Sequence, residues 1–233
     1  MSESKTNIIN HRAGILPRFA RTKKFNFITF FLFCWGIMVL TFGVSLTILS
    51  DLGASPFDAL LVGLSSSCGF SVGTWEVLIA LLLIGCNSGL ARQRPEFSGL
   101  LTACITGLGI DLWLHLLTPL IQPELWLSKI VCYTAGILTI GLGTSIYLYT
   151  NYAPTPVDRL TLVLQAVTRL NILFTRTMIY LTFLLAALIF NGPIGMGTLL
   201  TVCLGGLILS FFMPLTQKIL DKLPHGNTHQ PTT

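Results

Sequence analysis

The sequence predicts an all-α polytopic membrane protein of about six transmembrane helices in a 3+3 inverted repeat, with two short re-entrant or interfacial helices. Hydrophobic residues make up 52% of the chain, charged residues 10%, and mean hydropathy is +0.76. Soluble domains carry about 25% charged residues, so this composition excludes them. Several uncharged apolar runs approach the ~20 residues that cross a bilayer. The chain also repeats itself at an offset of 100 residues.

The repeat is clearest in Ser55-Pro56-Phe57-Asp58, which returns as Thr155-Pro156-Val157-Asp158. Each copy follows a long apolar segment. Because each unit holds three transmembrane helices, an odd number, the second unit enters the membrane in the opposite orientation to the first. Inverted repeats of this kind recur in transporters, which bind their substrates where the repeats meet.

The predicted spans divide the chain into four parts. Residues 1–26 form a basic cytoplasmic N-terminal segment, 27–118 the first three-helix repeat, 119–217 the second, inverted repeat, and 218–233 a cytoplasmic C-terminal tail. The basic leader resembles a secretory signal, but the apolar core that follows exceeds the 7–15 residues of a signal, so we expect a retained helix. The expected transmembrane helices are Phe27–Leu49, Trp75–Leu90, Phe97–Thr118, Ile130–Thr150, Arg176–Phe190 and Ile194–Thr216.

Basic residues predict the orientation. With the N-terminus inside, 13 of the 14 Lys and Arg residues lie on the inner side and only Lys129 lies outside. This bias predicts a multi-pass protein of the plasma (inner) membrane with both termini cytoplasmic. The net charge of +5 comes mostly from these flanking segments, so no nucleic-acid partner is expected. An interfacial aromatic belt is expected from Trp75, Trp126, Tyr147, Tyr149 and Tyr152.

Each copy of the Pro-x-Asp element is typical of a helix start. Ser55 or Thr155 is the expected N-cap, Pro56 or Pro156 the first helical residue, and the aspartate reaches back to the cap. The helix that follows, 56–67 or 156–168, measures about 18 Å and is too short to span the bilayer. Either the aspartates only cap helices, or two capped half-helices open into one cavity. A carboxylate at the helix start favours a proton, a cation or a zwitterion over an anion.

Two further charges are expected below the membrane surface. The uncharged runs 77–90 and 177–190 hold only 14 residues each. To span fully, each helix must take in preceding residues, which brings in Glu76 and Arg176, again 100 positions apart. Short segments at matching places in two halves indicate a transporter site. The alternative is that both residues stay at the interface, with Arg176 snorkelling.

Asp111 and His115 lie four residues apart and share one helix face. They form either a local hydrogen-bonded couple or a proton-coupling element. No third ligand has convincing spacing, and no Cys-x-x-Cys pair exists, so neither a metal site nor a cofactor is expected. No nucleotide-binding loop or catalytic series is present, so we expect no enzyme activity.

The sequence resembles the YczE/YyaS-type integral membrane proteins of bacteria over roughly residues 30–217. The resemblance rests on Leu52–Leu60, Ser71–Trp75, Ile110-Asp111, Pro156–Asp158, Arg176-Thr177 and Gly192–Thr198. It implies a plasma-membrane location and a suspected role in transport, and it brings no catalytic residues. One departure is Tyr180, which stands where such proteins commonly carry Glu four positions after the Arg.

The leading hypothesis is a small secondary transporter or permease for a small solute. The alternative is a non-transporting accessory protein that assists or anchors a membrane-protein partner. Both place the chain in a lipid bilayer. The candidate substrate or coupling-ion residues are Asp58, Glu76, Asp111, His115, Asp158 and Arg176. The helix-capping repeat residues are Ser55, Pro56, Thr155 and Pro156.

Overall fold

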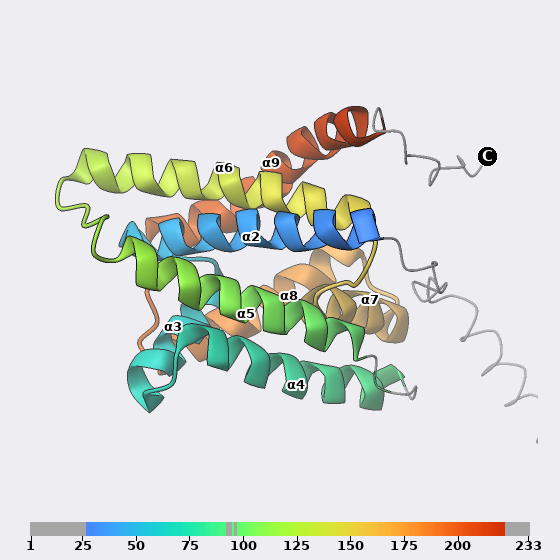
Figure 1. Cartoon of the computed structure of the whole chain (residues 1–233). Coiled ribbons are helices and arrows are strands. Elements are labelled where there is room, and N and C mark those ends of the chain that lie inside the picture. The colour runs from blue at the N-terminus through green and yellow to red at the C-terminus, as the bar shows by residue number, and fades with distance from the viewer. Residues whose placement is uncertain (1–26, 92–94, 96, 222–233) are drawn as a thin grey trace, which may run out of the picture.

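The described residues, 27–91, 95 and 97–221 of a computed structural model, are all helix and connecting loop, without strands. Six of the helices are long and apolar enough to cross a membrane, which confirms the predicted class (Figure 1). The predicted terminal segment 1–26, Arg92, Arg94 and most of the tail 218–233 lie outside the described residues. The six helices are α2 (Phe27–Leu49), α4 (Val72–Ala91), α5 (Ser98–Leu117), α6 (Trp126–Thr150), α8 (Ile172–Ile189) and α9 (Met196–Leu220).

Two short helices separate these spans, α3 (Pro56–Cys68) and α7 (Pro156–Thr168). Each has 13 residues and is therefore about 20 Å long, short of the ~30 Å hydrocarbon core. Proline occupies the first helical position of both, where its missing N–H costs no hydrogen bond. Both helices therefore begin where the sequence predicted, and α3 ends one residue later.

Helices α2 and α6 pack antiparallel and in very close contact (Figure 1). Two glycines from each make this approach: a Cβ on Gly43 would lie 2.6 Å from the Ile140 nitrogen, and one on Gly143 would lie 2.3 Å from the Leu40 nitrogen. Small residues allow membrane helices to approach closely in this way. A Cβ on Gly36 would lie 2.7 Å from the Tyr147 nitrogen, and one on Gly136 would lie 2.9 Å from the Gly43 carbonyl oxygen.

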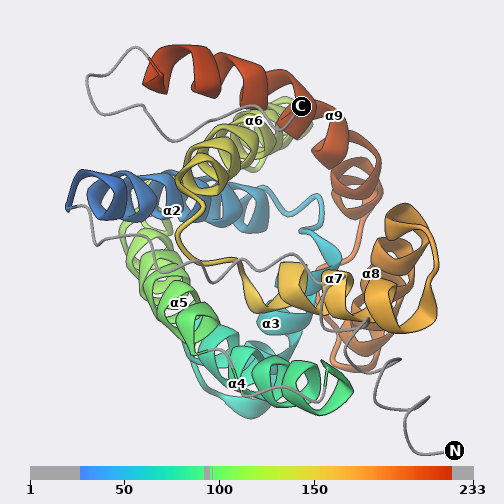
Figure 2. The ribbon, with the colours of Figure 1, turned by 90° about the vertical axis from the view of Figure 1, so that its right-hand side faces the viewer.

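The short helices lie inside the bundle, between α4 and α8. Helix α3 packs on α8, and α7 packs on α4, so each short helix contacts a long helix from the other half of the chain. Seen end-on, the long helices surround α3 and α7 (Figure 2). This exchange of partners places the N-termini of both short helices in the interior.

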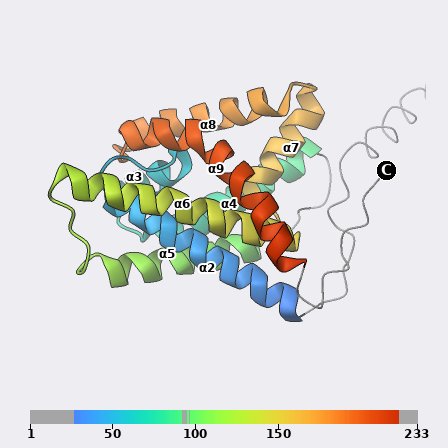
Figure 3. The same ribbon diagram turned by 90° about the horizontal axis from the view of Figure 1, so that it is seen from above.

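The two helical hairpins differ in how tightly they close. Helices α4 and α5 lie side by side, with Gly73 against the Gly107 backbone. Helices α8 and α9 instead diverge from the turn that joins them (Figure 3), and α9 packs mainly on α6. Gly206 lies 99 positions after Gly107, at the matching place in the second hairpin. A Cβ added to Gly206 would have no atom within 4 Å. The bundle is therefore closed along α4–α5 and open along α8–α9.

The observed helix starts explain the short uncharged runs. Helix α4 begins at Val72, four residues before Glu76. Helix α8 begins at Ile172, four residues before Arg176. Ser71 accepts a hydrogen bond from the Thr74 N–H, and Asn171 accepts one from the Leu173 N–H, so both starts are capped. Glu76 and Arg176 consequently lie within the helices, in their second turn.

Candidate functional site

A cavity of about 390 Å³ occupies the interior and receives residues from all eight helices. Its size falls within the range of small-molecule sites. The N-termini of α3 and α7 both open onto it, and aliphatic residues of the long helices form most of its wall. The ionisable residues that line it are Asp58, Glu76, Tyr147, Asp158, Arg176 and Tyr180.

Asp58 lies at the third position of α3 and faces the cavity. The Ser55 hydroxyl donates to the Asp58 carboxylate over 2.6 Å and accepts from the Asp58 N–H at 3.2 Å. The serine therefore caps the helix as predicted. The aspartate accepts from the cap hydroxyl, whereas a capping box would bond to the cap N–H.

Asp158 repeats this arrangement at the start of α7 and adds a second side-chain donor. The Thr155 hydroxyl donates to its carboxylate over 2.8 Å and accepts from its backbone N–H at 3.2 Å. The hydroxyl of Tyr147 on α6 also donates to the carboxylate, over 3.0 Å. Arg176 lies within electrostatic range of Asp158. The second aspartate thus accepts hydrogen bonds from two side chains, Thr155 in the preceding loop and Tyr147 on α6.

Arg176 lines the cavity from α8, where its guanidinium donates to the Tyr180 hydroxyl at 2.9 and 3.3 Å. The same group lies 5.2 Å from the centre of the Tyr180 ring, within cation–π range. Arg176 is nevertheless exposed at the surface of the helical bundle beside α8.

Glu76 is buried, with 7% of its surface exposed, and it lines the cavity from α4. Among the described residues, no hydrogen bond or ion pair reaches its carboxylate; the one ion pair found there joins Lys129 to Asp51. Glu76 and Asp58 are close enough for their charges to interact. Glu76 and Arg176 share the cavity without forming an ion pair.

Asp111 and His115 do not line this cavity. Asp111 accepts a hydrogen bond from the Ser71 hydroxyl at 2.6 Å and another from the Gly73 N–H at 2.8 Å. It therefore fixes the start of α4 against α5. His115 is exposed, and no hydrogen bond joins it to Asp111.

Tyr147 corrects the expected aromatic belt. The sequence places it at the inner interface, but it is buried, with 5% of its surface exposed, and it packs against Phe33, Ile37 and Ala153. No sequence signal distinguishes it from Tyr149 and Tyr152, because all three lie at or just beyond the end of the same apolar run. Trp126 is exposed at the start of α6, as a belt residue would be.

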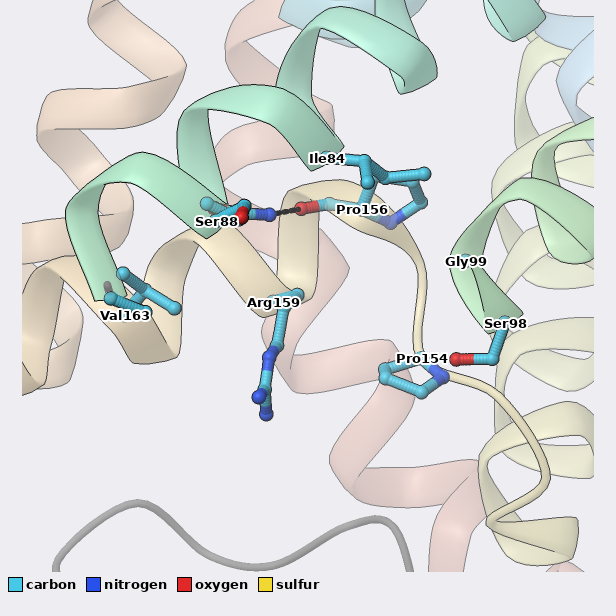
Figure 4. A pocket seen from close by; sticks show the side chains of 10 residues that line it. Ile84, Ser88, Ser98, Gly99, Pro154, Pro156, Arg159 and Val163 are labelled. Atoms are coloured by element: carbon cyan, nitrogen blue, oxygen red, sulfur yellow. Dashed lines mark hydrogen bonds between the residues drawn. The ribbon is translucent and has the colours of Figure 1, made fainter. Parts of the chain in front are cut away.

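Asn87 is a second residue that the sequence analysis missed. Its side-chain amide donates to the Pro156 carbonyl over 3.1 Å and ties α4 to the first residue of α7. A smaller pocket of about 30 Å³ adjoins this contact, with Ile84 and Ser88 of α4 opposite Pro156 and Arg159 of α7 (Figure 4). The pocket has room for about a water molecule or two. Asn87 therefore helps to hold the N-terminus of α7 at the large cavity.

The described residues contain no cluster of three or more His, Cys, Asp or Glu side chains that could hold a metal ion. The cavity is lined by three carboxylates and one guanidinium, a formal excess of two negative charges when all are ionised.

These features define the chain as an all-helical, multi-pass membrane protein with a charged central cavity. It belongs to the family described as "Family of unknown function (DUF6198)", which matches residues 27–214. This bears out the resemblance to YczE and YyaS.

Three curated relatives are similar over most of their length. "Uncharacterized protein YyaS" of Bacillus subtilis (strain 168) is 55% identical over 183 residues, 78% of this chain and 91% of the relative. "Uncharacterized membrane protein YczE" of the same organism is 35% identical over 187 residues, 80% and 86% of the two chains. An "Uncharacterized protein" of Haemophilus influenzae (strain ATCC 51907 / DSM 11121 / KW20 / Rd) is 26% identical over 204 residues, 88% and 89%. No solved structure matches the chain.

Proposed function

We propose that this chain is a small secondary transporter or permease that carries a small solute across the plasma membrane, with both termini in the cytoplasm. One observation carries the proposal. The N-termini of α3 and α7, two short capped helices from separate parts of the chain, open onto one cavity together with Glu76 and Arg176. Half-helices that meet around charged residues inside the membrane are typical of transporter sites.

The contacts between helices support an inverted repeat as the basis of this function. Helix α3 packs mainly on α8 of the second half, and α7 packs mainly on α4 of the first half. Gly136 is the repeat equivalent of Gly36, and Gly43 is the repeat equivalent of Gly143. The close contact between Gly36 and Gly143 therefore corresponds to the close contact between Gly136 and Gly43. Both relations are expected for two copies of one unit related by an in-plane rotation.

The difference between the two hairpins supplies a route to the cavity. The closed α4–α5 pair and the open α8–α9 pair occupy equivalent places in the two proposed repeats. Alternating access would exchange these conformations, so that α8–α9 closes as α4–α5 opens. In this proposal the solute enters the present conformation beside α8, where Arg176 is exposed.

Flux measurements test the transport proposal. A panel of amines, amino acids, carboxylates and sugars is first screened for solutes that raise the thermal stability of the detergent-solubilised protein. Each solute that does so is then followed into proteoliposomes. We expect at least one to be taken up faster than in empty liposomes. If no solute both stabilises the protein and crosses the membrane with it, the transport proposal fails.

The exposed surface of α9 favours the second candidate, an accessory membrane protein. Only 6% of the most apolar 18-residue stretch of α9 is buried inside the chain, the smallest share among the six spans. A partner that packs on α9 would co-purify in stoichiometric amount from mild detergent, and substitutions on the exposed face of α9 would release it. Absence of flux together with such a partner would favour this candidate.

A further inference from the structure

Glu76 is a carboxylate without a counter-charge. It is more than nine-tenths buried, it faces the cavity, and no described side chain donates to it or pairs with it. A buried charge in apolar surroundings is strongly unfavourable unless a counter-charge or hydrogen bonds offset it. The neighbouring residues on its helix face, Ala80 and Leu83, offer neither. Either a proton on the carboxylate or a cation that enters the cavity can supply the missing positive charge, and the cavity that Glu76 lines leaves room for such a cation.

Asp58 adds a second carboxylate at the same place. It lines the same cavity and lies within electrostatic range of Glu76, and among the described residues its only side-chain partner is the Ser55 hydroxyl. Two carboxylates so close repel each other, which increases the preference of this part of the cavity for a cation.

The corresponding place in the second half of the chain already contains its own cation. Arg176 occupies the position equivalent to Glu76, and Asp158 has Tyr147 and Thr155 as hydrogen-bond donors. In the first half, Thr47 stands where Tyr147 stands in the second, and its hydroxyl donates to the Val44 carbonyl. The unbalanced negative charge of the cavity therefore lies at Asp58 and Glu76.

Most of the cavity wall on the helices of the first half is apolar, formed by Val44, Phe57, Ala80, Leu83 and Ile110. The hydroxyls of Ser55, Thr102 and Thr106 also line the cavity, and each is already hydrogen-bonded within the protein. An inorganic cation would need several oxygen ligands to replace its water shell, whereas an alkylammonium or arylammonium group needs one or two carboxylates and apolar contacts. Phe57 also presents an aromatic ring, which attracts organic cations.

We propose that Asp58 and Glu76 bind a small organic monocation, with its charge between the two carboxylates and its apolar body against Phe57 and the aliphatic wall. This inference deepens the proposed transport function, on which it rests, by naming the class of solute.

A fluorescent probe of this class tests the site directly. Dimethylaminostyryl-methylpyridinium is a monocation whose emission rises in apolar surroundings, and the uncharged styrylpyridine of the same ring system is its neutral counterpart at alkaline pH. Both are titrated into the full-length protein in a non-ionic detergent. The variants are Glu76→Gln, Asp58→Asn and Glu76→Asp, with Glu124→Gln as the matched control, because Glu124 is exposed and outside the cavity.

We expect wild type and Glu124→Gln to bind the cation equally, and Glu76→Gln and Asp58→Asn to bind it at least about tenfold more weakly. Glu76→Asp should recover part of the affinity. Because Glu76→Gln removes an unpaired buried charge, its thermal stability without ligand should equal or exceed that of wild type, which separates a binding role from a structural one. The neutral counterpart should bind wild type and Glu76→Gln alike.

Three results would overturn the assignment: unchanged cation binding by Glu76→Gln, equal binding of the neutral compound and the cation by wild type, or displacement of the cation by millimolar Na⁺ alone. These failures are distinct from a failure of the transport proposal. Flux of an anion or sugar without cation binding would refute the site and leave transport standing. Cation binding without flux of any solute would support the site and refute transport.

Discussion

The Tyr147 hydroxyl donates a hydrogen bond to the Asp158 carboxylate over 3.0 Å and joins α6 to the start of α7. Asp58, at the equivalent place in the first half, has no such partner, because Thr47 replaces the tyrosine and bonds within its own helix. The two aspartates of the repeat therefore differ in their surroundings: Asp158 accepts hydrogen bonds from two side-chain hydroxyls, and Asp58 accepts from one.

Tyr147→Phe should destabilise the protein, since it removes a donor from a carboxylate inside the bundle. A hydrogen bond to a charged group contributes about 1.5–3 kcal/mol, so we expect a loss in the free energy of unfolding of that order, measured in mixed micelles. Tyr149→Phe is the matched control, because Tyr149 donates to Asp221 at the exposed end of the same helix. Equal losses in the two variants would contradict the role given to Tyr147.

Gly43→Ala should separate α2 from α6. The added Cβ would lie 2.6 Å from the Ile140 nitrogen and 2.7 Å from the Gly136 carbonyl oxygen, and a backbone cannot yield as a side chain can. Overpacking of this kind costs about 1–3 kcal/mol. Gly206→Ala makes the same change where nothing lies within 4 Å, and its effect should stay within about 0.5 kcal/mol. Thermal unfolding of the purified variants measures both, and similar midpoints would show that the glycine contacts do not hold the helices together.

Ser55→Ala separates the capping role of the first Pro-x-Asp element from its binding role. The variant loses both hydrogen bonds between the Ser55 hydroxyl and Asp58 but keeps the carboxylate itself. Loss of an N-cap costs about 0.5–2 kcal/mol, so its thermal stability should fall while most of its cation affinity remains. Asp58→Asn should show the opposite pattern. If both variants lose stability and keep the same affinity, the aspartate is only a cap.

Asp111→Ala should loosen the contact between the start of α4 and α5, because Ser71 and the Gly73 N–H lose their acceptor. Leaving such groups without a partner costs about 1–3 kcal/mol in the free energy of unfolding. His115→Ala should have little effect on stability, since His115 is exposed and has no side-chain hydrogen bond with any residue that the structure describes. Neither variant should change cation binding, and a loss of binding in His115→Ala would restore the proton-coupling hypothesis.

The sequence was sufficient to predict the residues that stand out against an apolar background. Asp58, Glu76, Asp158 and Arg176 were predicted because charges inside apolar runs are rare and because the repeat aligned them in pairs. Burial of Glu76 followed from a length rule, since a run of 14 residues cannot span the bilayer.

Tertiary contacts decide what the sequence left open. Tyr147 looks like an interfacial tyrosine, and only the packing of α6 against Phe33 and Ile37 shows that it is buried. Asp111 stands in an apolar run as Asp58 does, but its helix lies beside the start of α4, which needs an acceptor. The partner exchange of α3 and α7 involves residues far apart in sequence, which no local pattern encodes.

Labelling of two equivalent residues tests the proposed inversion most directly. Cys68 ends α3 and Thr168 ends α7, both are exposed, and they stand 100 positions apart. In a background without other cysteines, a membrane-impermeant maleimide is applied to intact spheroplasts and to inverted vesicles. We expect Cys68 to react only from the outside and the Thr168→Cys variant only from the inside. Reaction of both from the same side would show that the two halves are not inverted.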